Sequence, residues 1–166
     1  MRHLVAFPIL ALAVILQSAI VSRIGLLSGY ADLVLVIIVA WALQEGVTTA
    51  WHWAIVAGAM TAVVTGLPWF VPFAGFLVAV FLARILQKRI WQAPLISMFT
   101  VTFLASLFFY LLSFVVINFI GASLPLGDTF SLVALPSLLL NLLLAVPVYW
   151  LMRDLAQWVH PVEEEE

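Results

Sequence analysis

The sequence contains no cysteine and very few charged residues. None of its 166 residues is Cys, and only 8% are Asp, Glu, Lys or Arg. The absence of cysteine excludes disulfide bonds, thiolate zinc sites and cysteine nucleophiles. A soluble domain usually carries about 25% charged residues. The few charged residues here could not cover the surface of a soluble domain of 166 residues. Six Lys and Arg against eight Asp and Glu also leave no basic patch for nucleic acid.

Hydrophobic residues make up 66% of the chain, well above the roughly 45–50% of soluble domains. This composition predicts an integral membrane protein. It also excludes disorder, because disordered segments are polar and charged. We predict a single transmembrane helical domain over residues 1–158 and a polar acidic C-terminal tail over residues 159–166. Half of the eight acidic residues stand in that tail, as the run 163–166.

Six apolar stretches are candidates for helices that cross the membrane, which takes about 20 apolar residues. The second stretch is weak because Asp32 interrupts it, and the fourth is short with Pro72 at its start. Short segments can be re-entrant or lie inside the protein. The predicted fold is an all-α bundle of six transmembrane helices, with five as the alternative. The stretches are 4–21, 27–43, 50–67, 71–86, 95–120 and 130–152.

The orientation follows from the preference of Lys and Arg for cytoplasmic loops. With six spans and the N-terminus inside, Arg23 is the only Lys or Arg that lies outside. With five spans and the N-terminus outside, Arg2 is the only one. Both arrangements place the basic 84–94 loop and the C-terminus in the cytoplasm. We favour six spans, with the first helix uncleaved rather than removed as a signal peptide. In that arrangement the Lys and Arg residues on the cytoplasmic side are Arg2, Arg84, Lys88, Arg89 and Arg153.

Tryptophan prefers the membrane interface, and all seven tryptophans lie near the ends of predicted segments. This agreement supports the boundaries of the predicted segments.

Small residues recur at every fourth position of the third and fourth predicted helices. Such a face lets helix backbones approach closely in a membrane. Its neighbour is either another helix of the same chain, which we favour, or a partner protein. The residues are Ala50, Ala54, Gly58, Ala62 and Gly66 in the third helix and Gly75, Ala79 and Ala83 in the fourth.

Polar residues within the apolar stretches are few, and each one requires a partner. Ser137, Asn141 and Ala145 share one stripe of the last helix, and Asn141 falls at its middle. This stripe is interpreted as a structural polar clamp or, alternatively, as a substrate or partner contact. The candidate partners of Asn141 are Asn118 and Ser113 of the fifth helix.

Charged residues have predicted roles in structure and topology. Asp32 could form an ion pair with Arg23 at the outer surface. The basic end formed by Arg84, Lys88 and Arg89 is predicted to be a cytoplasmic anchor that anionic lipids attract.

Sequence signatures of catalysis are missing. The chain has no nucleophile elbow, no zinc-protease motif and no phosphate-binding loop. We therefore predict no catalytic residue, no metal site and no cofactor.

Two stretches resemble a known family of bacterial membrane proteins. The first is Leu16-Gln17-Ser18 and then Ala31-Asp32 with residues 33–43, and the second is Leu135-Pro136-Ser137 with Asn141 and Pro147-Val148-Tyr149. The length and the basic loop also fit, and together these features resemble the rod shape-determining protein MreD. Departures from the family pattern are Ala31 where proline is frequent, and Val63-Val64 where an acidic residue is frequent.

The resemblance implies a non-enzymatic scaffold of the cell-elongation machinery in the inner, cytoplasmic membrane. Its expected partners are MreC, the RodA glycosyltransferase with its penicillin-binding transpeptidase, membrane lipid and, indirectly, MreB. The implied fold is similar to that of the substrate-binding subunits of energy-coupling-factor transporters. A vitamin-binding subunit of such a transporter is therefore the alternative function. Against it, no two alanines of the first helix are four residues apart, as docking to the coupling subunit would require.

Overall fold

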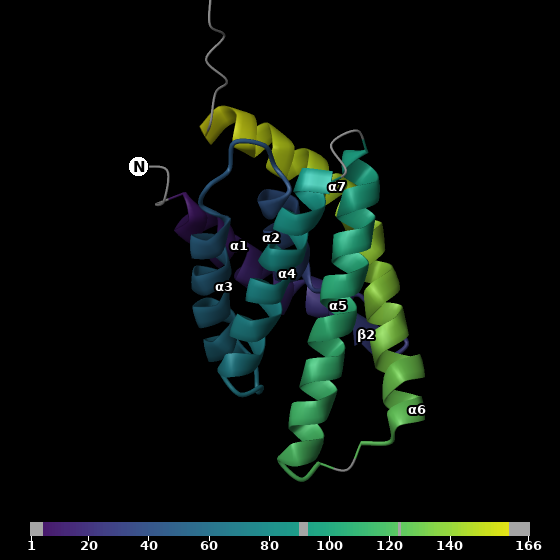
Figure 1. Cartoon of the computed structure of the whole chain (residues 1–166). Coiled ribbons are helices and arrows are strands. Elements are labelled where there is room, and N and C mark those ends of the chain that lie inside the picture. The colour runs from purple at the N-terminus through teal and green to yellow at the C-terminus, as the bar shows by residue number, and fades with distance from the viewer. Residues whose placement is uncertain (1–4, 90–92, 123, 160–166) are drawn as a thin grey trace, which may run out of the picture.

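The computed structural model describes residues 5–89, 93–122 and 124–159. These residues form a bundle that is almost entirely helical (Figure 1). The elements are α1 (Ala6–Ala19), η1 (Val21–Arg23), β1 (Gly25–Leu26), β2 (Gly29–Tyr30), α2 (Leu33–Ala42), α3 (Ala50–Val64), α4 (Phe70–Arg89), α5 (Pro94–Phe119), α6 (Leu126–Thr129), η2 (Phe130–Ala134) and α7 (Leu135–Val159).

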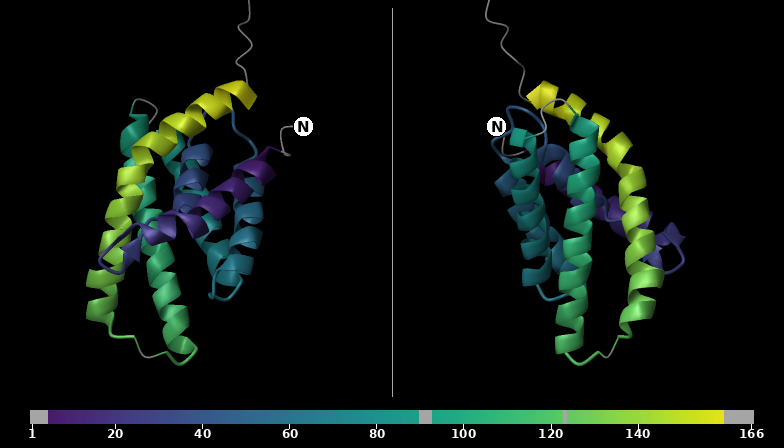
Figure 2. Two further views of the ribbon diagram at one scale, coloured as in Figure 1. Left: turned by 180° about the vertical axis from the view of Figure 1, so that it is seen from behind. Right: turned by 45° about the vertical axis from the view of Figure 1, so that its right-hand side comes forward.

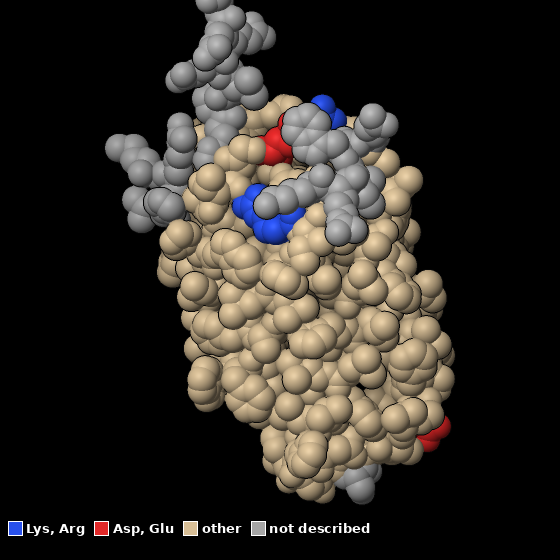
Figure 3. Space-filling view, in the orientation of Figure 1, with Lys and Arg blue, Asp and Glu red and all other residues tan. Residues whose placement is uncertain are grey.

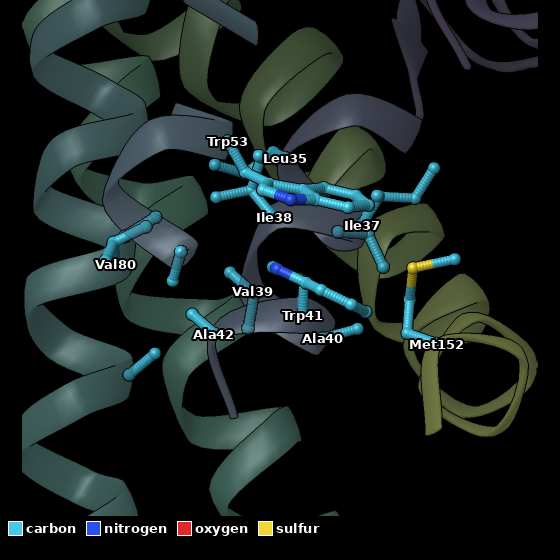
Figure 4. Close-up of a cluster of buried hydrophobic side chains, with 14 of the residues drawn as sticks. Leu35, Ile37, Ile38, Val39, Ala40, Trp41, Ala42, Trp53, Val80 and Met152 are labelled. Carbon is cyan, nitrogen blue, oxygen red and sulfur yellow. The ribbon is translucent and has the colours of Figure 1, made fainter. Parts of the chain in front are cut away.

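Helix α2 is the shortest of the main helices and lies at the centre of the bundle. It contacts α1, α3, α4, α5 and α7, and every residue from Val34 to Ala42 is buried. Its sequence explains this position, because a helix that is hydrophobic all round is buried on all sides. The core of the molecule therefore forms around α2, as Figure 4 shows.

Two tryptophans stack within this core. The rings of Trp41 in α2 and Trp53 in α3 lie 4.3 Å apart between centroids, and both side chains are at most 1% exposed. The Trp41 Nε1 atom donates a hydrogen bond to the Thr49 hydroxyl at 3.3 Å. The ends of α2 and α3 meet inside the bundle, where two flat rings fill the space between them.

A small antiparallel hairpin replaces the predicted start of the second helix. Strands β1 and β2 pair Gly25 with Tyr30 and Leu26 with Gly29. Leu27, at the turn, has a φ of 57°, which is incompatible with a right-handed helix. Residues 27–32 are thus not helical, and α2 begins only after Asp32.

Helix α5 and the last helical segment are longer than the rest of the bundle. α4 has 20 residues and α5 has 26, so α5 is longer by roughly 9 Å and extends beyond the turn between α3 and α4 (Figure 1). The segment α6–η2–α7 runs without a break over 34 residues, further at both ends than the predicted 130–152. Gly127 and Asp128 are part of α6.

Four helical segments are long and apolar enough to cross a membrane, so the chain has the fold of an all-α membrane protein. They are Ala6–Arg23, Phe70–Gln87, Pro94–Phe119 and Leu126–Val159. Two of the six predicted spans contain shorter helices, α2 with 10 residues and α3 with 15. In one face of the molecule, charged groups lie near its two ends and none lies between them (Figure 3).

The small residues predicted to form packing faces allow close contact between neighbouring helices of this chain. A Cβ atom at Gly58 of α3 would lie 2.9 Å from the Phe73 ring of α4. A Cβ atom at Gly75 of α4 would lie 2.2 Å from the Phe109 ring of α5. Both glycines therefore mark places where an aromatic ring packs directly on a helix backbone.

We expect Gly75→Ala to lower the free energy of unfolding by about 1–3 kcal/mol, the usual cost of overpacking a filled core. The higher helix propensity of alanine, about 1 kcal/mol, offsets only part of this cost. The measurement is thermal unfolding of the purified chain in mild detergent. Gly127→Ala in α6 is the control, because nothing lies within 4 Å of a Cβ atom there. Equal stability of the two variants would contradict the close contact between Gly75 and Phe109.

Candidate functional site

Gln17 from α1 pairs with the backbone that leads into α2. Its Oε1 atom accepts a hydrogen bond from the Leu33 N–H, and its Nε2 atom donates to the Ala31 carbonyl, both at 2.7 Å. The first N–H groups of a helix have no partner within the helix. In a membrane they cannot rely on water, so a side chain must supply the partner. Gln17 supplies it for α2.

Asp32 and Asn141 complete this end of α2. The Asp32 carboxylate accepts a hydrogen bond from the Leu35 N–H at 3.0 Å, as a helix N-cap does. The N–H of Asp32 donates to Asn141 Oδ1 at 2.6 Å, and Asn141 Nδ2 donates to the Ser106 hydroxyl at 2.8 Å. Asn141 is fully buried, so this single carboxamide joins α2, α5 and α7.

The hairpin that precedes α2 is fixed to α7 next to the same site. The Tyr30 N–H donates to the Ser137 hydroxyl at 3.0 Å. A Cβ atom at Gly29 would lie 2.6 Å from the Val133 carbonyl oxygen and 2.7 Å from the Ser137 backbone nitrogen. Glycine is therefore required at position 29, since no other side chain leaves room for this backbone contact.

Pro136 explains a further contact of the hairpin. Proline has no N–H, so the carbonyl four residues earlier, that of Leu132, loses its α-helical donor. The Ser28 N–H donates to this carbonyl at 3.1 Å. The π-helical turn η2 covers the same residues, and such turns are frequent where a helix takes part in a site. The hairpin is thus bound by η2 and by the first turn of α7.

Tyr110 of α5 lies beside these groups. Its hydroxyl lies near the side chains of Ser137 and Asn141. We call this arrangement the polar cluster; its side chains are those of Gln17, Asp32, Ser106, Tyr110, Ser137 and Asn141.

The opposite end of α2 has its own set of side-chain partners. Gln87 of α4 donates from Nε2 to the Gln44 carbonyl at 2.9 Å and to the Leu43 carbonyl at 3.4 Å. Gln44 in turn donates to the Ala40 carbonyl at 2.9 Å. Arg84 donates to the Val47 carbonyl. Both ends of α2 are therefore closed by side chains, most of them from other helices.

Most of the small residues predicted to form packing faces are buried inside the helix bundle. Ala54, Gly58, Gly75, Ala79 and Ala83 are buried between helices, Ala62 is partly exposed and Gly66 is exposed. Helices α3, α4 and α5 of the same chain occupy these faces, which leaves no room there for the alternative neighbour, a partner helix. The stripe of Ser137, Asn141 and Ala145 is also buried, towards α2 and α5.

Two predicted pairings are replaced by others. Asn118 bonds the Phe114 carbonyl and the Leu124 N–H, and Ser113 bonds the Phe109 carbonyl, so neither is the partner of Asn141. The structure gives that role to Ser106 and the Asp32 backbone.

Arg23 is exposed at the end of η1, whereas the Asp32 carboxylate caps α2. The interfacial ion pair considered from the sequence is therefore replaced by a helix cap. In the predicted basic anchor, Arg84 binds backbone as described above. The side chains of Lys88 and Arg89, and the tail from residue 160, lie outside the described residues.

Several members of the site had no predicted role. Gln17 belonged to a motif, but nothing in the sequence indicated what it binds. Ser106, Tyr110, Gln44 and Gln87 were not singled out. The available indication was that each is a polar residue within or beside an apolar stretch. Such a pattern marks residues that need partners but does not say which ones.

The polar cluster can fix a backbone in place, and its hydrogen-bonding groups are largely used for this purpose. In the described part of the chain, no group of three or more His, Asp or Glu side chains could hold a metal ion. No family model, no curated protein and no solved structure matches the chain. The fold and the site thus define an all-α membrane protein whose short central helix is held by side-chain caps.

Replacing Asn141 with leucine should destabilise the hairpin and the start of α2. The change leaves the buried Asp32 N–H without an acceptor, which costs about 1–3 kcal/mol. Hydrogen exchange in detergent or nanodiscs should rise at residues 28–33 and change little at residues 50–64. Asn118→Leu is the control, because its loop partner Leu124 is exposed and can bond water. Unchanged exchange at residues 28–33 in Asn141→Leu would remove this role of the carboxamide.

Proposed function

We propose that this chain is a non-enzymatic scaffold of the cell-elongation machinery in the bacterial inner membrane, as its resemblance to MreD implies. In this role it binds the single-span protein MreC and helps organise peptidoglycan synthesis. RodA with its penicillin-binding transpeptidase, and MreB indirectly, are the further partners. The fold would then be similar to that of energy-coupling-factor substrate-binding subunits.

One observation carries the proposal: the two stretches on which the resemblance rests meet in the polar cluster. Within the first stretch, Gln17 binds the backbone on both sides of Asp32. Ser137 and Asn141 of the second stretch bind the backbone N–H groups of Tyr30 and Asp32. A motif whose members bind one another serves to fix an arrangement of helices. This supports a role in assembly over a role in chemistry.

The same observation weighs against a vitamin-binding subunit. A small-molecule site needs polar groups that converge on a cavity, whereas here Gln17 and Asn141 direct theirs to backbone and to Ser106. On α1, Ala6 and Ala13 are buried towards the core, so they offer no small-residue surface to a coupling subunit.

Partners would bind the outer surface of the bundle, because other helices of the same chain already pack against the small-residue faces. Large apolar side chains are exposed along α1, α5 and α7, for example Leu12, Leu111 and Leu143. In a membrane these side chains face lipid or a partner helix, and packing against them supplies the contact. The mechanism would be to present a rigid bundle whose shape is set by α2 and its caps.

Co-purification from mild detergent tests the proposal. We expect the chain to recover MreC and not the core of an energy-coupling-factor transporter when both are offered side by side. Asn141→Leu should reduce the yield of the MreC complex more than Asn118→Leu, because it loosens the bundle's centre. Recovery of the transporter core alone would reject the scaffold hypothesis.

Reporter fusions test the proposed orientation. A periplasm-active reporter fused after Leu126 should be active and one fused after Arg89 inactive, because the basic loop is held in the cytoplasm. A fusion near Arg23 distinguishes the two span counts, and six spans require activity there. Activity after Arg89 would invert the orientation and remove the assigned cytoplasmic end.

A further inference from the structure

The last part of α7 turns away from the rest of the helix and crosses the end of the bundle (Figures 1 and 2). Pro147 lies inside the helix and removes the donor for the Leu143 carbonyl, which is a common cause of such a bend. Beyond it, Tyr149 and Met152 are buried against the bundle, while Trp150 and Trp158 are exposed. Tryptophan prefers the membrane interface, so this segment has the composition of a helix lying at the membrane surface.

A groove opens where this segment passes the start of α5. Its volume is about 230 Å³, and it is lined by residues 93–96 together with Tyr149, Trp150 and Arg153. All the lining side chains are apolar or aromatic except that of Arg153. The Arg153 guanidinium lies over the Trp150 ring, 5.0 Å from its centroid. This cation–π contact places a positive charge at the rim of an apolar groove.

The groove fits part of an amphiphile better than a whole metabolite. Its volume is below the roughly 300–1,000 Å³ of sites that enclose drug-sized ligands. Its lining offers an apolar wall, with Ile96 59% exposed and Trp150 45% exposed, and a single cation beside it. An acyl chain matches the wall and a headgroup phosphate matches the cation.

We propose that the groove between the first turn of α5 and the bent end of α7 binds one anionic phospholipid, with its phosphate on Arg153 and an acyl chain against Ile96 and Trp150. Two acidic groups limit the preference of the groove for anionic over neutral lipid. Asp154 follows Arg153 in the chain and is exposed, and Glu45 acts electrostatically on Tyr149. A cation near the membrane surface contributes about 1 kcal/mol of attraction to anionic lipid. This converts to a preference of about fivefold over a neutral lipid.

Lipid titration of the purified full chain tests this site. The probes are phosphatidylglycerol and phosphatidylcholine with identical chains, and native mass spectrometry counts the lipid that stays bound. We expect one tightly held phosphatidylglycerol, bound about fivefold more tightly than phosphatidylcholine. Arg153→Gln should abolish the preference. Arg23→Gln removes another exposed guanidinium, one that does not line the groove, and should keep the preference.

A second variant tests the groove without changing its charge. Ile96→Trp should fill the groove and release the bound lipid of either kind, while thermal stability stays close to that of the unmodified chain because Ile96 is exposed. Equal binding of the two lipids by the unmodified chain would overturn the proposal. Equal effects of Arg153→Gln and Arg23→Gln, or full lipid retention in Ile96→Trp, would do the same.

Discussion

The structure depends on one constraint, which is that a helix ending inside an apolar bundle must have its terminal backbone groups satisfied by side chains. Helix α2 has only 10 residues and is buried on every side, so water reaches neither of its ends freely. Gln17, Asp32 and Asn141 satisfy the first end, and Gln44 and Gln87 satisfy the second. The surrounding helices are therefore held in place by the short helix that they enclose.

This constraint explains the irregular parts of the chain. The hairpin before α2 would expose unpaired backbone, and it is accepted by Ser137 and by the Leu132 carbonyl that Pro136 leaves free. Two defects in regular structure thus compensate for each other, because an unpaired donor on one segment meets an unpaired acceptor on another. Gly29 permits the contact, since its backbone lies directly against α7.

Such an arrangement would suit the proposed scaffold role. Caps that come from distant segments make the helices cooperative, because loss of one carboxamide loosens α2, α5 and α7 together. The outer surface keeps large apolar side chains exposed, while the bent end of α7, which carries Arg153, crosses the end of the bundle (Figure 1). Internal rigidity and external contact are thus provided by different residues.

The sequence by itself determined the class of protein and the order of its helices, because hydropathy over about 20 residues decides whether a helix can cross a membrane. It also indicated that Asn141 and Asp32 need partners, since an isolated polar group in an apolar stretch cannot remain unpaired. Only the tertiary structure decided what those partners are. They lie up to 109 residues away in the chain, and no local pattern records such a distance. For the same reason, only packing could show that Trp41 and Trp53 belong to the core and that Gly58 and Gly75 receive aromatic rings.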